Sequence, residues 1–168
     1  MAGLISIFFA SLLFFMVLAL VVGAPLVFSK NKTAQAMIEL LDVKPGELVY
    51  DLGSGDGRLL ILAAKKRAKI IGIEINPYVA IFSWIKVVLS GVGRNVQIIW
   101  GNFWSCDLSK ADKVIVYGVP WIMEKIGKKL QTELKPGTKV VSNSFQIPNL
   151  TLVKTAQIGN DKIYLYVI

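Results

Sequence analysis

Short apolar runs alternate with segments of helical hydrophobic spacing from residue 30 to the end of the chain. The runs predict strands at 48–52, 70–75, 96–100, 113–117 and 138–145, and the helical spacing predicts helices at 33–41, 59–67, 78–89 and 121–134. Two further strands, 151–157 and 162–167, flank a turn at 158–161. This alternation predicts an α/β domain with a parallel sheet, helices on both faces and a C-terminal antiparallel hairpin. The helix at 78–89 is expected to bury four large side chains: Trp84, Ile85, Val88 and Leu89.

Residues 1–29 form a separate apolar segment without a charged side chain. Its 25 residues from 4 to 28 contain only Ser6 and Ser11 as polar residues. As a helix they would measure about 37 Å, enough to span a hydrocarbon core of about 30 Å. A cleaved signal peptide fits less well, because a basic n-region is absent and the apolar core is too long. The pattern predicts a transmembrane anchor over 1–29 and a separate domain over 30–168.

The charge distribution predicts where that domain lies. Lys30 and Lys32 flank only the C-terminal side of the apolar segment, and the positive-inside rule places that side in the cytoplasm. The net charge is +8 and the mean hydropathy +0.58, with every charged side chain in residues 30–168. The surplus of basic residues is explained by anionic lipid near the domain, which attracts each basic residue at its surface by about 1 kcal/mol. The sequence lacks the aromatic-basic cluster typical of nucleic-acid binding, so a nucleic-acid partner is not expected.

The chain has one cysteine and no histidine. Cys106 alone cannot form an internal disulfide and is expected to be a loop or core residue. The absence of histidine argues against a metal site and against a histidine-based catalytic triad.

A glycine-rich turn at residues 49–58 joins the first predicted strand to the helix after it. Its glycines occupy three alternate positions: Gly53, Gly55 and Gly57. Such a turn points backbone N–H groups at a ligand, and glycine permits both the backbone angles and the close approach. The dinucleotide fingerprint would need a glycine where Arg58 stands, and the Gly-Lys-Ser/Thr of a P-loop is absent. Asp51 at the strand end suits a ligand that carries an ammonium and a sulfonium better than it suits a polyphosphate.

A second carboxylate supports a nucleotide-type cofactor site. Glu74 ends the next predicted strand, about twenty residues on, where a doubly wound sheet places the acid that accepts the ribose hydroxyls. Together with residues 72–77, the glycine turn resembles the motifs of the seven-stranded S-adenosylmethionine (SAM) methyltransferases, class I. The residues Phe103-Trp104 and the stretch 116–120 resemble more closely a small family of protein-lysine methyltransferases. That family includes a compact archaeal enzyme and membrane-anchored mitochondrial enzymes acting on the ATP synthase c subunit and the adenine nucleotide translocase.

The resemblance covers about residues 33–168 and implies a Rossmann-like seven-stranded sheet that binds SAM. The cofactor residues that it implies are Asp51, Gly53, Ser54, Gly55, Gly57, Glu74, Ile75, Asn102, Phe103 and, more weakly, Thr33. Many class I enzymes carry an acid where Asn102 stands. The Asn102 carbonyl can still accept from the adenine amine, so weakened adenine recognition is expected.

The fourth predicted strand leads to the expected methyl acceptor site. Ligands of open α/β sheets bind outside the carboxyl ends of the strands, where the strand order reverses. The residues expected to line an acceptor slot there are Trp104, Tyr117, Gly118, Pro120 and Trp121. An apolar slot would lower the pKa of an acceptor lysine, and Tyr117 could accept its proton or orient the amine. The Asn/Asp-Pro-Pro-aromatic motif of nucleobase amino-methyltransferases is absent, and the sequence offers no convincing general base.

Three functions agree with these features. The first is a membrane-anchored protein-lysine methyltransferase whose acceptor lysine lies near the bilayer, because an anchor raises the effective concentration of membrane-associated substrates. The second is a lipid or quinone methyltransferase, which the predicted anchor suits equally well. The third is a non-catalytic SAM-binding scaffold, because no catalytic side chain is certain. The close match at Phe103-Trp104 and 116–120 favours the first.

Overall fold

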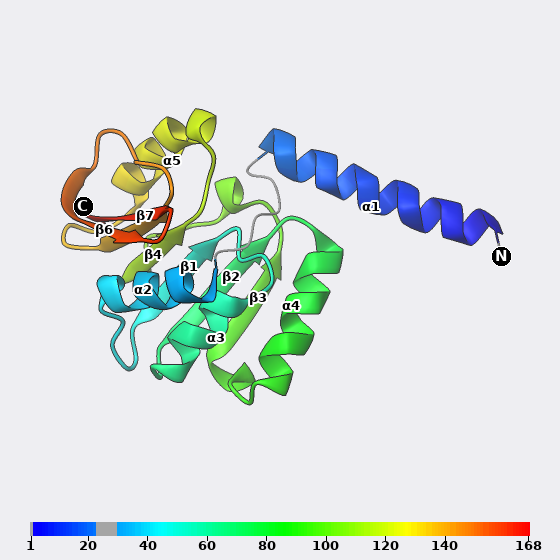
Figure 1. Cartoon of the computed structure of the whole chain (residues 1–168), viewed down its shortest axis with the longest axis horizontal. Coiled ribbons are helices and arrows are strands. Elements are labelled where there is room, and N and C mark those ends of the chain that lie inside the picture. The colour runs from blue at the N-terminus through cyan, green and yellow to red at the C-terminus, as the bar shows by residue number, and fades with distance from the viewer. Residues whose placement is uncertain (1, 23–29) are drawn as a thin grey trace.

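The computed structural model of the chain describes residues 2–22 and 30–168. Figure 1 shows a sheet with helices packed around it and the N-terminal helix α1 projecting from one side. The helices are α1 (Ala2–Val22), α2 (Asn31–Leu41), α3 (Arg58–Lys65), α4 (Pro77–Leu89) and α5 (Pro120–Glu133), with single-turn 3-10 helices η1 (Gly93–Asn95) and η2 (Phe103–Ser105). The strands are β1 (Leu48–Leu52), β2 (Lys69–Glu74), β3 (Val96–Trp100), β4 (Lys113–Val116), β5 (Lys139–Asn143), β6 (Thr151–Ile158) and β7 (Asp161–Val167).

Seven strands form one sheet in the order β3-β2-β1-β4-β5-β7-β6. Neighbouring strands from β1 to β5 pair in parallel, whereas β7 is antiparallel to both β5 and β6. The order reverses between β1 and β4, where Leu52 lies opposite Val116. The seven strands and the terminal antiparallel pair agree with the predicted sheet. The carboxyl ends of β1 and β4 therefore lie side by side at the point where such sheets bind ligands.

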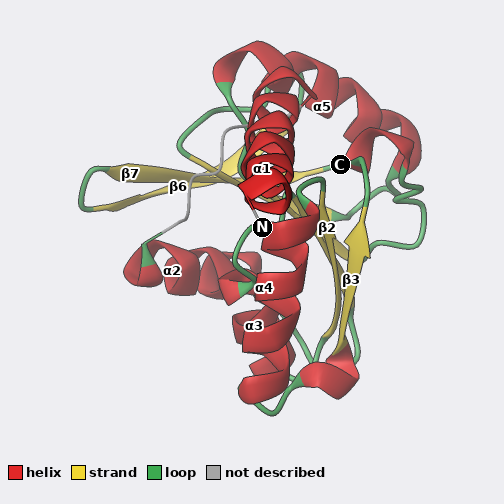
Figure 2. Cartoon of the chain, turned by 90° about the vertical axis from the view of Figure 1, so that its right-hand side faces the viewer, coloured by secondary structure: helices red, strands yellow, loops and turns green. Residues whose placement is uncertain are grey.

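The side chains of the sheet point alternately to two cores. Val49 of β1 belongs to the core under α2 and α3, together with Met37 and Leu60. Tyr50 and Leu52 belong to the core under α5. This period of two follows from the pleat of the strand, and it allows helices to cover both faces. Figure 2 shows α3 and α5 on opposite sides of the sheet.

The predicted transmembrane helix is wrong. Within residues 2–22 and 30–168, the structure contains no helix that is long and apolar enough to cross a membrane. The described helix α1 ends at Val22, short of the predicted span to residue 28, and residues 23–29 lie outside the described part. Its middle also contacts the domain, because Phe15 packs edge-on against Tyr78 and Trp100. The predicted boundary at residue 30 and the cytoplasmic location, which depended on the helix, stay predictions that no described residue tests.

The predicted burial of the large side chains of α4 is wrong as well. Trp84, Ile85, Val88 and Leu89 are exposed. The residues of α4 that face the sheet are smaller: Ala80, Ser83 and Val87. Helical spacing identified the helix but not its inward face, because α4 is apolar almost all the way round and its sequence contains no polar stripe that would mark the solvent side.

Candidate functional site

The glycine turn between β1 and α3 carries its glycines where the backbone requires them. Gly53, Gly55 and Gly57 have φ angles of 91°, 53° and 77°, in the left-handed region that favours glycine. The intervening residues point inward, and Ser54 and Asp56 are buried. In this motif each glycine therefore bends the chain, and each residue between two glycines contributes a buried polar side chain.

Two buried polar atoms lie unpaired at the start of this turn. Asp51 Oδ2 and Ser54 Oγ make no hydrogen bond within the described residues. Burial, and then the negative charges of Glu74 and Asp56, raise the pKa of Asp51 to about 8. An unpaired buried carboxyl carries a large desolvation cost, which a cationic hydrogen-bond donor would offset. The predicted role of Asp51 toward an ammonium group therefore fits the structure.

Glu74, the last residue of β2, fastens the glycine turn to the neighbouring strand. Its Oε2 accepts from the backbone N–H of Gly55 at 3.0 Å, and its Oε1 accepts from the backbone N–H of Asn76 at 2.9 Å. Burial raises the pKa of the Glu74 carboxyl, although these backbone donors oppose the rise. Each oxygen retains a further lone pair, so Glu74 can hold the turn and still accept from a ribose hydroxyl.

Asp56 is a structural residue of the turn that the sequence analysis missed. It forms ion pairs with Arg58 at 2.8 Å and with Lys86 of α4 at 2.6 Å. Burial raises the pKa of Asp56, but the hydrogen bonds from Arg58 and Lys86 outweigh burial and hold it at about 2. Asp56 thereby ties the glycine turn to α4. An acid between two glycines was visible in the sequence, but its partner 30 residues on was not.

Three further predicted cofactor residues lie at the ends of two neighbouring strands. Ile75 follows β2 and Asn102 follows β3, and the two strands end in register, with Glu74 opposite Trp100. Asn102 is exposed, and its side-chain oxygen caps η2 by accepting from the backbone N–H of Trp104 at 3.0 Å. One lone pair of that oxygen remains for an amine. Phe103 is half-buried beside it, as expected for an apolar neighbour of a ring.

The predicted acceptor residues lie after β4, at the start of α5 and beside α5. Tyr117 follows β4, next to the glycine turn that follows β1, and it is half-buried. Pro120 begins α5, and Trp121 is 67% exposed at the rim. Gly118 is buried, and a Cβ there would come within 2.8 Å of the Met123 sulfur, so a larger residue requires the Met123 side chain to shift.

Trp104 packs beside α5. Its ring lies 4.7 Å from the ring of Phe103, and the Lys125 ammonium lies 4.3 Å from its centre. Thr33, the weakest candidate, is buried, and its hydroxyl donates to Asp161 Oδ2 at 2.6 Å at the start of β7. Thr33 thus has a structural partner, and its predicted role toward the cofactor is untested.

The end of β5 supplies buried polar groups that the sequence analysis did not identify. Ser142 lies opposite Val116 of β4 and donates its hydroxyl to the Phe145 carbonyl at 2.7 Å. Asn143 follows it and is 1% exposed. A polar run, Ser142 to Ser144, after an apolar strand was a signal for a site at a strand end, because buried polar groups concentrate at functional positions.

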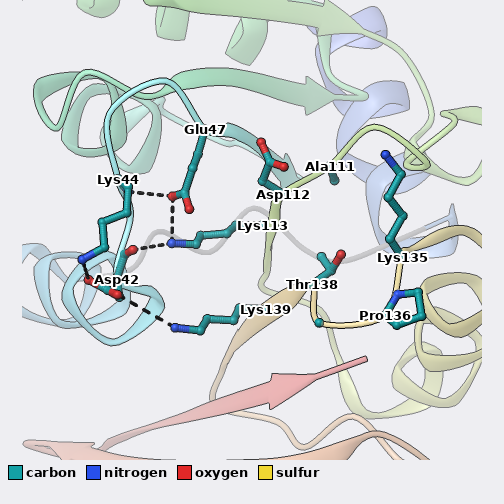
Figure 3. A pocket seen from close by; sticks show the side chains of 11 residues that line it. Asp42, Lys44, Glu47, Ala111, Asp112, Lys113, Lys135, Pro136, Thr138 and Lys139 are labelled. Carbon is teal, nitrogen blue, oxygen red and sulfur yellow. Dashed lines mark hydrogen bonds and ion pairs between the residues drawn. The ribbon is translucent and has the colours of Figure 1, made fainter.

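A cavity of about 380 Å³ lies at the opposite, amino edge of the sheet (Figure 3). Lys113 is buried there and pairs with Glu47 at 2.7 Å, and it also donates to the Asp42 carbonyl. Lys44 pairs with Asp42 at 2.7 Å. The residues that line the cavity are Asp42, Lys44, Glu47, Ala111, Asp112, Lys113, Lys135, Pro136, Gly137, Thr138 and Lys139. Ion pairs among these charges join the beginnings of β1, β4 and β5, so the network is structural.

The carboxyl edge therefore combines three features of one site. The glycine turn leaves open space beside Gly53, Asp51 supplies an unpaired carboxyl, and Glu74 supplies an acceptor for a ribose. Beside them, the residues after β4 offer a mostly apolar rim with a phenol. This arrangement can bind a nucleoside that carries a cationic tail and can present the end of that tail to an apolar acceptor site. The described residues hold no cluster of metal-ligating side chains.

Known proteins resemble the chain over this region and beyond. The profile of the ANTKMT methyltransferase domain matches residues 51–154. A protein-lysine N-methyltransferase of Saccharolobus islandicus is 36% identical over 150 residues, which cover 86% of this chain and 93% of the relative. The lysine N-methyltransferase of Mus musculus that is named for the ATP synthase c subunit is 32% identical over 142 residues, which cover 84% of this chain but only 57% of the relative.

A solved structure is similar as well. It is described as the crystal structure of an RNA methyltransferase from Salinibacter ruber in complex with S-adenosyl-L-homocysteine. It superposes with a TM-score of 0.81 at 34% sequence identity and covers 84% of this chain and 94% of that one.

Proposed function

Because the chain belongs to the ANTKMT methyltransferase domain family and is a SAM-dependent methyltransferase, we propose that it methylates lysine side chains of proteins. The observation that carries the lysine assignment is the similarity to the archaeal protein-lysine N-methyltransferase over 93% of that protein. The mouse relative is longer, and its substrate is no guide to the acceptor of this chain. We expect the acceptor to be a membrane-associated protein, which the exposed apolar side chains of α4 support.

The residues of the carboxyl edge have separate roles in this proposal. Asp51 and Ser54 bind the amino-acid end of the cofactor, Glu74 binds its ribose, and Ile75 with Phe103 contacts its adenine. SAM supplies an electrophilic sulfonium methyl group. The protein mostly has to align the acceptor amine with that methyl and to exclude water. Pro120 and Trp121 form the apolar rim that favours a neutral amine, and Tyr117 orients the amine or takes its proton.

The test supplies the purified chain and radiolabelled SAM to a cell extract that lacks this protein, with its membranes retained. Protein, lipid and RNA are separated before counting. Label in a discrete protein band, lost with Glu74→Ala but kept with Glu39→Ala on the exposed side of α2, supports the proposal. Mass spectrometry of the band must then find methyl-lysine. Label that appears only in lipid would replace the proposal with lipid or quinone methylation, and intact SAM binding without label would favour a scaffold.

Transfer to RNA is the second candidate, because the similar structure from Salinibacter ruber is described as an RNA methyltransferase. The net charge of +8 also favours an anionic partner. The same extract decides between the two. Label that is removed by ribonuclease and resists protease would favour RNA, and label that is removed by protease alone would favour protein.

A further inference from the structure

The outer side of α4 exposes a continuous apolar surface. Six large side chains on this helix of 13 residues are between 44% and 82% exposed. We call them the outer α4 face: Ile81, Phe82, Trp84, Ile85, Val88 and Leu89. Trp100, at the end of the edge strand β3, is 63% exposed. Contiguous apolar surface on this scale is uncommon on a domain that meets only water, and it marks an interaction site.

The arrangement of α4 is inverted relative to an ordinary surface helix. Small residues pack against the sheet, and the large aromatic and aliphatic residues point away from it. The helix would contribute more to the core if it were rotated, because the burial of a large apolar side chain stabilises by about 1.5–3 kcal/mol. The hydroxyl of Ser83 is instead buried without a hydrogen-bond partner in the described structure. The outward apolar side chains therefore indicate a second apolar environment outside the domain.

The charges around this surface suit an anionic lipid headgroup layer. Between Glu74 and Asp107 the sequence contains no acidic residue, and Lys86 and Arg94 are its only charged residues. Tryptophan is enriched where proteins meet the headgroup region, and two of the four tryptophans lie here, Trp84 and Trp100. Because this segment carries no negative charge, an anionic membrane would not repel it.

The apolar part of α1 lies on the same side of the molecule. In Figure 1 both α4 and the projecting α1 lie on the right, and Figure 2, seen from that side, shows α1 pointing toward the viewer above α4. Phe15 of α1 joins the two surfaces, since its ring lies 6.2 Å from the ring of Tyr78 and 6.4 Å from that of Trp100. Large apolar residues of α1 are exposed as well, among them Ile7, Phe9 and Phe14. One side of the molecule is thus apolar over two separate elements.

We propose that the outer α4 face is a lipid-binding surface that lies in the headgroup region of an anionic bilayer, with α4 parallel to the membrane plane. A helix of 13 residues is about 20 Å long and about 10 Å wide. A stable protein interface needs roughly 800 Å² per partner together with good shape complementarity. Interfacial lipid binding has no such minimum, and its strength scales with the apolar area inserted and with the attraction of basic residues to anionic lipid.

Lipid binding by α4 would also place the cofactor site near the bilayer. Lys86 lies on the same helix, and its ion pair with Asp56 fastens α4 to the glycine turn. The membrane-bound surface and the cofactor turn therefore belong to one rigid unit. This inference does not rest on the chemical class of the methyl acceptor.

The test reads the environment of α4 itself, so that lipid contacts of other segments do not decide the result. In the full chain with Cys106→Ser, one probe position is created by Ile85→Cys and a matched one by Val153→Cys, which lies on β6 and is similarly exposed. Each is labelled with an environment-sensitive fluorophore. The chain is mixed with vesicles of phosphatidylcholine plus phosphatidylglycerol, with and without lipids spin-labelled near the headgroup. We expect the probe at position 85 to shift to shorter wavelength and to be quenched, and the probe at position 153 to do neither.

Two outcomes would overturn the proposal. A probe at position 85 that stays in water in the presence of vesicles excludes lipid contact. A probe that is shielded without vesicles, and more so at higher protein concentration, identifies a second copy as the occupant. As a further check, Trp84→Glu with Leu89→Glu should return the position-85 probe to water while SAM binding, which reports the fold, is retained. The control double variant, Leu152→Glu with Val153→Glu, should leave the position-85 probe shielded by lipid. Equal quenching of the position-85 probe in the α4 double variant and in this β6 double variant would contradict the role of α4.

Discussion

The backbone of Gly57 lies against the side chain of Ser83. A Cβ placed on Gly57 would overlap the Ser83 hydroxyl oxygen and would lie 3.3 Å from the Ser83 Cβ. Gly57 also has a φ of 77°, which other residues adopt only at a cost. The last glycine of the turn is therefore needed for the approach of α4 as well as for the bend. Asp56 and Lys86 hold the same two segments together one residue away.

Gly57→Ala is expected to displace the glycine turn from α4 and to weaken SAM binding at least tenfold. Rotation of the Ser83 hydroxyl would still leave its Cβ at 3.3 Å from the new methyl group, so the turn must also shift. Titration calorimetry with SAM, together with thermal unfolding, measures both effects.

Two variants separate the overlap from the cost of the backbone angle. Gly91→Ala meets a similar φ, 73°, but nothing lies within 4 Å of the new Cβ, so only a modest loss of stability is expected. Ser83→Ala removes a buried hydroxyl without a partner among the described residues and should be close to neutral alone. Combined with Gly57→Ala, it should restore part of the SAM affinity. A double variant no better than Gly57→Ala would show that the overlap is not the cause.

The pKa of Asp51 predicts a specific pH dependence of stability. Its value of about 8 in the folded chain lies above the 3.8 of the exposed group. Between these values the folded chain binds a proton that the unfolded chain has released, so the free energy of unfolding should decrease as the pH rises. Chemical denaturation from pH 5 to pH 9 measures the trend. Asp51→Asn should flatten it, and an equal slope in that variant would assign the trend to other groups.

SAM should bind more tightly as the pH approaches 8 from below. The ammonium group of the cofactor prefers the charged carboxylate, so binding lowers the pKa of Asp51 and releases a proton. Calorimetric titrations in two buffers of different ionisation enthalpy detect that release. Buffer-independent heats at pH 7 would indicate that Asp51 is already charged in the free chain.

Glu74→Ala should weaken SAM binding at least tenfold. The substitution removes charge-assisted bonds to the ribose, worth about 1.5–3 kcal/mol each. It also removes the acceptor for the Gly55 N–H, which loosens the turn. Glu74→Gln should lose affinity too, because its amide NH₂ would face one of the two backbone donors. Equilibrium binding of SAM measures the loss, Glu39→Ala is the control, and unchanged affinity in Glu74→Ala would refute the assigned site.

The sequence predicted those elements whose boundaries are set locally. β1 and β3 have their predicted ends, because each is a short apolar run between turn residues. β5 was predicted to continue to residue 145 but ends at Asn143, since Ser144 turns the chain with a φ of 67°. The prediction extended the strand through Ser142-Asn143-Ser144, although such a polar run is typical of a turn. The candidate cofactor residues could be named from the sequence because a strand, a glycine turn and a second acid are close in sequence.

Relationships across long sequence separations were not predictable. The pair of Asp56 with Lys86 depends on how α4 lies against the turn, and no local pattern encodes that angle. The rotation of α4 about its own axis was equally unpredictable from the sequence. Trp84 and Leu89 were therefore wrongly expected to be buried. The transmembrane helix was predicted from hydropathy and length alone, a reasoning that ignores the contacts of Phe15 with the domain.

The ion pair at the amino edge should matter for stability and not for SAM. Lys113→Met leaves Glu47, which is 26% exposed, without its partner. Removal of one member of a buried pair costs about 3–5 kcal/mol, and the partial exposure of Glu47 should put the loss near the lower end. Lys128→Met, in an exposed pair with Glu124, should change stability by less than about 1 kcal/mol. Urea unfolding measures both, and a weakened SAM affinity in folded Lys113→Met would contradict a purely structural role.

The acceptor slot can be tested through Tyr117 and Trp104, which come from different segments, after β4 and after β3. If Tyr117 takes the proton of the acceptor amine, Tyr117→Phe should lower kcat by about 10²-fold or more, the usual contribution of a positioned base. Trp104→Ala should mainly raise the KM for the acceptor, because its ring packs with Phe103 and Lys125 and has no group that could take the proton. Trp84→Ala in lipid-free buffer is the control for loss of a large exposed ring. Steady-state kinetics with the identified acceptor separate kcat from KM. Full turnover in both Tyr117→Phe and Trp104→Ala would place the slot elsewhere, and Ser142 and Asn143 at the end of β5 would then be the next residues to change.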